Sequence, residues 1–109
     1  MPTALGPLEL AVLLAVAHDG EAYGLAVRRE VSRRLQHDYS VGAVYTTLER
    51  LERKGLVRSR ISEPLPVRGG RSRRLFRVTR AGERALRDAQ RTAQSLWAGR
   101  GIRIRPQPI

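Results

Sequence analysis

The stretch Ser40–Val57, SVGAVYTTLERLERKGLV, decides the fold, because it combines a buried helical face with an unusual first turn. Its apolar residues recur every three or four positions, at Val41, Val44, Tyr45, Leu48 and Leu51. This spacing predicts a helix with one buried face that ends before Gly55. The first turn nevertheless carries Gly42 and Ala43, and glycine costs a helix about 1 kcal/mol relative to alanine. The small residues at the start of this helix therefore suggest a role other than helix stability.

The side of this helix away from the apolar stripe carries small, hydroxyl and basic residues. We predict that it binds DNA, because a recognition helix enters the major groove with its N-terminal residues. Small side chains allow a close approach, a threonine can contact a thymine methyl group, and an arginine can reach guanine or phosphate. The predicted contacts are Ser40, Gly42, Ala43, Tyr45, Thr46, Thr47, Arg50 and Arg53. The alternative is that Gly42 and Ala43 only pack closely against the preceding helix, with the arginines as a solvated face.

The composition points to an anionic partner. The 109 residues suit one domain, and the formal net charge is +11 with a pI near 11.6. Such an excess favours nucleic acid first and anionic lipid second. Lys54 is the only lysine, so the basic residues are otherwise all arginine. Arginine suits phosphate and guanine edges, although a GC-rich genome would produce the same bias.

Hydrophobic patterning along the chain predicts three helices, a two-stranded hairpin and a last helix. This order predicts a mainly α winged helix-turn-helix with an added C-terminal helix, whose apolar stripe would have no partner in so small a core and is therefore expected to serve dimerisation. The domain is predicted to cover residues 1–98, and the tail 99–109 to be disordered. The predicted helices are 8–18, 23–35, 41–54 and 80–98, and the predicted strands are 56–61 and 73–78.

The hairpin would be the wing, and its charge strengthens the DNA hypothesis. Between Arg58 and Arg80 the sequence has eight arginines and one acidic residue, Glu63. A solvated surface usually mixes both signs, and like-charge crowding is unfavourable without an anionic partner. The predicted DNA contacts of the wing are Arg68, Gly69, Gly70, Arg71, Arg73 and Arg74.

Nothing in the sequence favours an enzyme, a metal site or a cofactor. There is no cysteine, and the two histidines, His18 and His37, lie in separate breaks between helices. No metal-ligand spacing or phosphate-binding loop is present. The apolar run Leu8–Ala17 is too short to span a bilayer and lacks a basic segment before it. We therefore expect a cytoplasmic protein that does not interact with membranes.

Three motifs together resemble those of PadR-type transcriptional regulators. They are an apolar first helix followed by Tyr23-Gly24, the stretch SVGAVYTTLERLERKGLV, and GGRSRRLFRVTRAG at Gly69–Gly82. The resemblance covers about residues 5 to 97 and is closest to the short branch of the family. Three positions depart from the family pattern, namely Ala43 in place of Thr, Thr46 in place of Pro, and Phe76 in place of Tyr. The first two lie on the predicted DNA face, so they affect which sequence is recognised.

The resemblance implies a cytoplasmic homodimer that binds an inverted-repeat operator in double-stranded DNA and usually represses. In the family, dimerisation runs mainly through the C-terminal helix with help from the first helix. The interface residues would then be Leu10, Leu14, Leu86, Ala89, Ala93, Leu96 and Trp97. The alternative is that the C-terminal stripe folds back on its own subunit. Some relatives bind small aromatic effectors near this interface, where Trp97 would be either a pocket wall or a packed interface residue.

Two other binding functions compete with this one. A non-specific or structured-RNA-binding basic protein would explain the charge equally well, but the scattered tyrosines and single phenylalanine offer no platform for stacking bases. A winged helix used as a protein-interaction module is the other alternative, and the basic wing argues against it.

Overall fold

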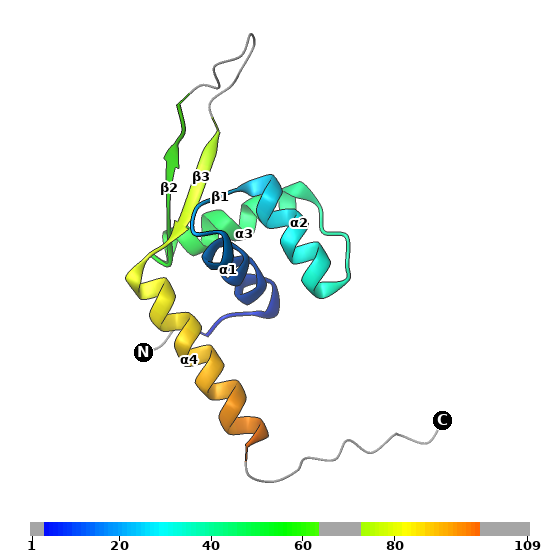
Figure 1. The fold of residues 1–109 in the computed structure, drawn as a ribbon, viewed down its shortest axis with the longest axis vertical. Coiled ribbons are helices and arrows are strands. Elements are labelled where there is room, and N and C mark those ends of the chain that lie inside the picture. Colours follow the sequence, from blue (N-terminus) through cyan, green and yellow to red (C-terminus); the bar gives the residue numbers. More distant parts are fainter. Residues whose placement is uncertain (1–3, 64–72, 99–109) are drawn as a thin grey trace, which may run out of the picture.

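The computed structural model describes residues 4–63 and 73–98. In these two ranges the chain forms three helices around a core, a small sheet and a fourth helix that extends away from the core (Figure 1). The bounds are α1 Pro7–Asp19, β1 Ala22–Tyr23, α2 Gly24–Leu35, α3 Val41–Arg53, β2 Val57–Ile61, β3 Arg74–Val78 and α4 Arg80–Trp97. The helices and the two longer strands lie within one or two residues of their predicted positions.

Capping residues and glycines explain where the first helix begins and ends. Pro7 is the first residue of α1, where its missing N–H would have no partner. The Glu9 side chain accepts a hydrogen bond from the Gly6 N–H at 3.1 Å and thereby satisfies one of the free donors. Gly20 ends α1 with a φ of +79°, a conformation that side chains disfavour.

The core lies between the first three helices and the inner face of the sheet. Phe76 of β3 is fully buried and is the largest side chain in this core. The helical contribution comes from Val12, Leu13, Val16, Val27, Val31, Val44, Leu48 and Leu51, all of which are fully buried. In α2 and α3 these positions repeat at helical spacing, so a one-sided apolar pattern sufficed to predict those helices, whereas α1 was predicted from a run that is apolar nearly all round.

The sheet has three strands rather than the predicted two-stranded hairpin. Its order is β1–β3–β2, and both pairings are antiparallel. Ala22 and Tyr23 of β1 lie opposite Phe76 and Leu75 of β3. The predicted hairpin is confirmed as the pair β2–β3, but the prediction missed β1. A strand of two residues is too short for any alternation to show, and Tyr23 reads as the start of a helix.

A tight junction connects the end of α3 to the start of α4. The Thr79 hydroxyl donates to the Gly55 carbonyl at 2.7 Å, and its oxygen accepts from the Gly82 N–H at 3.1 Å. The Thr79 N–H donates to the Leu56 carbonyl at 3.1 Å. A Cβ atom added at Gly82 would lie 2.2 Å from that same Leu56 oxygen. Only glycine therefore allows α4 to approach the backbone this closely.

One predicted core residue lies at the surface. Val41 was predicted on the buried face of α3, but its exposed fraction is 41%. It is the first residue of the helix. No helix in residues 4–63 and 73–98 is both long and apolar enough to cross a membrane. The described part of the chain thus forms a winged helix-turn-helix with an additional last helix.

Candidate nucleic-acid interface

Side chains of α2 fix the turn that leads into α3. The Arg28 Nε donates to the Tyr39 carbonyl at 2.7 Å, and the Ser32 hydroxyl oxygen accepts from the Tyr39 N–H at 3.4 Å. The Ser40 hydroxyl then accepts from the Ala43 N–H at 3.1 Å and caps the helix. Ser40 was therefore correctly predicted as the N-cap, whereas sequence reasoning missed the positioning roles of Arg28 and Ser32.

The polar side of α3 faces solvent. Gly42 and Thr46 are exposed in the first half of the helix, Arg50 and Arg53 are exposed in the second half, and Ala43 is half-buried. A Cβ atom added at Gly42 would meet no described atom within 4 Å. The alternative that Gly42 packs closely against the preceding helix is therefore wrong. Internal packing does not require a glycine here, so the first turn is open to a ligand.

Two residues of the predicted DNA face lie inward instead. Thr47 has an exposed fraction of 4%, and its hydroxyl donates to the Ala43 carbonyl at 2.8 Å. Thr47 therefore does not reach the surface, which corrects the prediction. Tyr45 is half-buried, and its ring lies edge-on to Phe76 at 6.4 Å between centroids. A Cβ atom at Gly24 would come within 2.3 Å of the Tyr45 Cζ, so this ring packs α3 tightly against α2.

The structure describes the base of the predicted wing but not its tip. Arg68, Gly69, Gly70 and Arg71 lie outside the described residues. Arg73 is exposed, and its guanidinium carbon lies 4.9 Å from the centroid of the Tyr23 ring. Arg74 is half-buried and donates to Glu52 of α3 and to the Ser59 hydroxyl. Arg73 is thus available to an anionic partner, whereas Arg74 already has protein partners.

Positive charge also gathers on the sheet face that points away from α3. Arg58 and Arg77 lie directly opposite each other on β2 and β3, and both are exposed. Like charges in directly opposite positions destabilise a sheet, so this pair favours an anionic environment. Arg60 donates twice to Glu21, at 2.9 and 2.6 Å, and the hydrogen bond lowers the pKa of the Glu21 carboxyl.

Glu30 on α2 already has two basic partners. Hydrogen bonds from Arg33 and Arg34 outweigh the loss of hydration and lower the pKa of Glu30 to about 2. By contrast, no ion pair involves Arg50, Arg53, Arg58 or Arg77 within residues 4–63 and 73–98. These four arginines are therefore available to bind an external anion.

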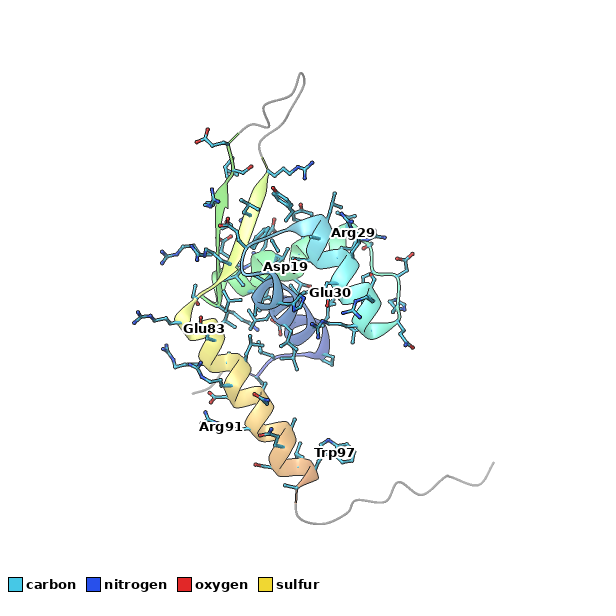
Figure 2. All side chains as sticks on the ribbon, viewed as in Figure 1. Asp19, Arg29, Glu30, Glu83, Arg91 and Trp97 are labelled. Atoms are coloured by element: carbon cyan, nitrogen blue, oxygen red, sulfur yellow. The ribbon has the colours of Figure 1, made fainter. Side chains whose placement is uncertain are left out.

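Within the described residues, the second half of the last helix exposes apolar side chains. Leu86 and Ala89 are half-buried, whereas Ala93, Leu96 and Trp97 are exposed, Leu96 by 68% and Trp97 by 60%. Figure 2 shows Arg91 and Trp97 on different sides of α4, beyond the three-helix core. Within residues 4–63 and 73–98, the side chains of Leu96 and Trp97 therefore do not fold back onto the three-helix core.

A groove of about 680 Å³ runs along this face, from Ala81 to Leu96 of α4. Leu10, Leu56, Ala85, Ala89 and Leu96 contribute to its lining, and Trp97 does not. Of the two interface residues predicted in α1, Leu10 lines this groove and Leu14 has an exposed fraction of 39%. The groove could accept either a second helix or a small apolar ligand.

Comparisons with known proteins show which family the chain belongs to. Residues 13–88 match the model of the transcriptional regulator PadR-like family. Over 91 residues the chain is 41% identical to the transcriptional regulator Rv3488 of Mycobacterium tuberculosis, a match that covers 79% of this chain and 78% of the relative.

Solved structures share the fold. A PadR family transcriptional regulator from Eggerthella lenta superposes with a TM-score of 0.67 at 26% identity, covering 82% of this chain and 73% of the other. RosR of H. salinarum superposes with a TM-score of 0.72 at 21% identity, covering 92% of this chain and 84% of the other.

Proposed function

The chain belongs to the PadR-like family of transcriptional regulators, and on that premise we propose that it is a sequence-specific binder of double-stranded DNA. It acts as a homodimer on an inverted-repeat operator and represses transcription there. In this proposal α3 enters the major groove, and the wing contacts the adjacent backbone. The two recognition helices of the dimer then lie about one DNA turn apart, or roughly 34–36 Å.

The exposed first turn of α3 is the observation that carries this proposal. Gly42 has open space around it, and the neighbouring Thr46 offers a hydroxyl and a methyl group. These two residues would read base edges, since small side chains allow the helix to approach closely. Arg50 and Arg53 would bind phosphates further along the groove, and Arg73 would do so at the base of the wing. The predicted contacts at the wing tip, Arg68, Gly69, Gly70 and Arg71, remain part of the proposal.

The first experiment is a selection from random duplex DNA, followed by fluorescence anisotropy titrations on the selected duplex and on a scrambled one. A preference on the order of a thousandfold or more, with two chains per duplex, would support a dimeric sequence-specific regulator. Equal and steeply salt-dependent binding to both duplexes would contradict it. The competing proposal is a non-specific or structured-RNA-binding protein. It predicts equal binding to the two duplexes and a comparable affinity for RNA.

Dimerisation is proposed to run through the exposed apolar face of α4 and the groove beside α1. Burial of Leu96 and Trp97 in a partner helix would remove apolar surface that is otherwise exposed to water. Leu96→Asp should therefore weaken the dimer by at least roughly tenfold in sedimentation experiments, because it places a charge in the interface. Gln94→Asp adds the same charge elsewhere on α4 and is the matched control. A dimer that persists in Leu96→Asp would place the interface elsewhere.

A small aromatic effector is proposed to bind beside this interface, in the part of the groove that the partner helix leaves open. The groove volume lies within the range of ligand pockets, and apolar side chains dominate among its lining residues. A phenolic ligand that raises the melting temperature and releases the operator would support this site. Leu10→Arg should then abolish both effects, and a ligand that acts equally on this variant would bind elsewhere.

A further inference from the structure

Glu52 lies where α3 passes the outer edge of the sheet. Strand β2 is the edge strand, because the order is β1–β3–β2. The Ser59 N–H of β2 donates to the Glu52 Oε2 at 3.0 Å, so it points away from β3 and toward α3. The Ser59 hydroxyl donates to the same oxygen at 2.7 Å. One carboxylate oxygen thus binds both the backbone and the side chain of the same edge residue.

Arg74 of β3 completes this arrangement. Its Nη2 donates to the Glu52 Oε1, and its Nε donates to the Ser59 hydroxyl oxygen at 3.1 Å. The guanidinium carbon also lies 5.0 Å from the centroid of the Phe76 ring, which is fully buried in the core. These contacts connect the recognition helix to both strands of the wing. We call Glu52, Ser59 and Arg74 the Glu52 network.

The network holds two opposite charges in a fixed geometry. The side chains of Arg74 and Glu52 are 35% and 31% exposed, so neither is fully solvated. The hydrogen bond from the Ser59 hydroxyl is the main cause of a lowered Glu52 pKa, and Arg74 contributes to the same direction. The carboxylate is therefore ionised at neutral pH and retains the guanidinium.

Glu49 provides a contrast on the same helix. It lies one turn before Glu52 and is exposed. No hydrogen bond or ion pair of its side chain is found within the described residues. The two glutamates carry the same charge on α3, but only Glu52 binds the wing.

We propose that Glu52 is a specificity-determining residue that acts by position: it fixes the wing against the recognition helix and keeps Arg74 from binding phosphate. This role rests on the proposed DNA-binding function. A mobile arginine at the base of the wing would bind any phosphate backbone, because such contacts carry no sequence information. The Glu52 network removes that contact and holds the wing at one angle to α3, so the bases can be read in one register.

The first test of this proposal removes the negative charge of Glu52. Glu52→Gln keeps the size and one acceptor oxygen but releases Arg74. Each released arginine should add about one phosphate contact, so the salt dependence of binding to a scrambled duplex should steepen by about 0.9 per bound chain. Binding to the scrambled duplex should tighten several-fold, and the preference for the selected duplex should fall by about tenfold.

Two matched variants separate this role from a general charge effect. Glu49→Gln removes the same charge from α3 without releasing an arginine. Glu21→Gln releases Arg60, which it binds with two hydrogen bonds on the opposite face of the sheet. Glu49→Gln should leave the preference for the selected duplex within about twofold of the wild type, since Glu49 forms no hydrogen bond or ion pair with the Glu52 network within the described residues. Glu21→Gln also frees an arginine, so it should steepen the salt dependence on the scrambled duplex in the same way. It leaves the wing fixed to α3, so the preference should fall clearly less than in Glu52→Gln.

Arg74→Ala tests the other half of the network. It should lower the preference for the selected duplex but leave the salt dependence on the scrambled duplex unchanged, because Arg74 does not bind phosphate in the intact protein. The double variant Glu52→Gln/Arg74→Ala should lose the steepening seen with Glu52→Gln alone. This readout also distinguishes the proposal from a simple loss of stability, which would lower the active fraction without changing the salt dependence.

The outcomes are decisive in each direction. If the wild type prefers its selected duplex and Glu52→Gln behaves like Glu49→Gln, this inference is wrong and the proposed function stands. If Arg74→Ala flattens the salt dependence, Arg74 is a phosphate contact and the inference is again wrong. If the wild type shows no sequence preference, the proposed function fails first, and a specificity role for Glu52 fails with it.

Discussion

Replacing Gly42 with alanine should separate the stability of the protein from its affinity for DNA. Gly42 is the second residue of α3, its φ is not positive, and an added Cβ meets no described atom within 4 Å. The alanine methyl group therefore creates no clash inside the protein. Alanine favours a helix by up to about 1 kcal/mol over glycine, partly because it restricts the unfolded chain. In this first turn we expect the free energy of unfolding to rise by about 0.5–1 kcal/mol.

Urea denaturation followed by circular dichroism measures this change. With a urea m-value of about 1.5 kcal/mol/M, the midpoint should increase by roughly 0.3–0.7 M. The melting temperature should rise by about 2–8 °C for a domain of this size. The protein concentration is kept fixed in both assays, because the stability of a dimer depends on it. A loss of stability would refute the inference that the space around Gly42 is open.

The same variant should bind DNA less well. If α3 approaches bases through its first turn, the added methyl group separates the two surfaces. We expect the affinity for the selected duplex to fall on the order of tenfold, or about 1.4 kcal/mol, with a smaller effect on a scrambled duplex. If the Gly42→Ala protein is stabilised but its affinity for the selected duplex is unchanged, Gly42 is not part of the DNA interface.

Three further substitutions, at Gly82, Thr47 and Glu9, test individual contacts within the fold. Gly82→Ala should lower the free energy of unfolding by about 1–3 kcal/mol in urea, because its Cβ would lie 2.2 Å from the Leu56 oxygen; unchanged stability would contradict that close approach. Thr47→Val should cost about 1 kcal/mol of stability and leave base preference unaltered, since it removes only an internal hydrogen bond. An altered base preference in a DNA selection would show that Thr47 belongs to the DNA interface. Burial alone would raise the pKa of Glu9, but hydrogen bonds, above all from Lys54, lower it below its usual value of 4.5. The stability contributed by Glu9 is therefore present above pH 4.5 and lost as the pH falls through the lower folded pKa. Glu9→Gln should reduce this acid loss in denaturation experiments between pH 3 and 7, and equal losses in both proteins would show that the ion pair does not stabilise the fold.

Local signals in the sequence were sufficient for the helices and for the wing strands. Ser40 and Thr79 cap their helices, and Gly20 and Gly55 end theirs with positive φ, as such residues commonly do. These effects involve neighbours within a few residues, so they can be recognised before the tertiary structure is known. The two residues of β1 gave no such signal, because their pairing with β3 depends on a segment more than fifty residues later.

The site was harder to predict than the fold, because side-chain polarity is a weak guide to exposure. Thr46 and Thr47 are adjacent hydroxyl residues, yet only Thr46 is exposed. Thr47 lies roughly 60° from Val44 on a helical wheel, within the buried arc, and its hydroxyl is satisfied by the backbone. The pairing of Arg74 with Glu52 joins residues 22 positions apart, so no local pattern could show that Arg74 pairs with a carboxylate of the protein rather than with DNA.

The edges of the sheet also affect how the protein behaves at high concentration. An exposed strand edge is a template for pairing with another chain, and this is a common route to aggregation. Here β1 is only two residues long, and the outward Ser59 N–H of β2 is occupied by a carboxylate from α3. Arg58 adds a charge along the same strand. The contacts that fix the wing therefore also oppose the growth of this sheet into intermolecular β-structure.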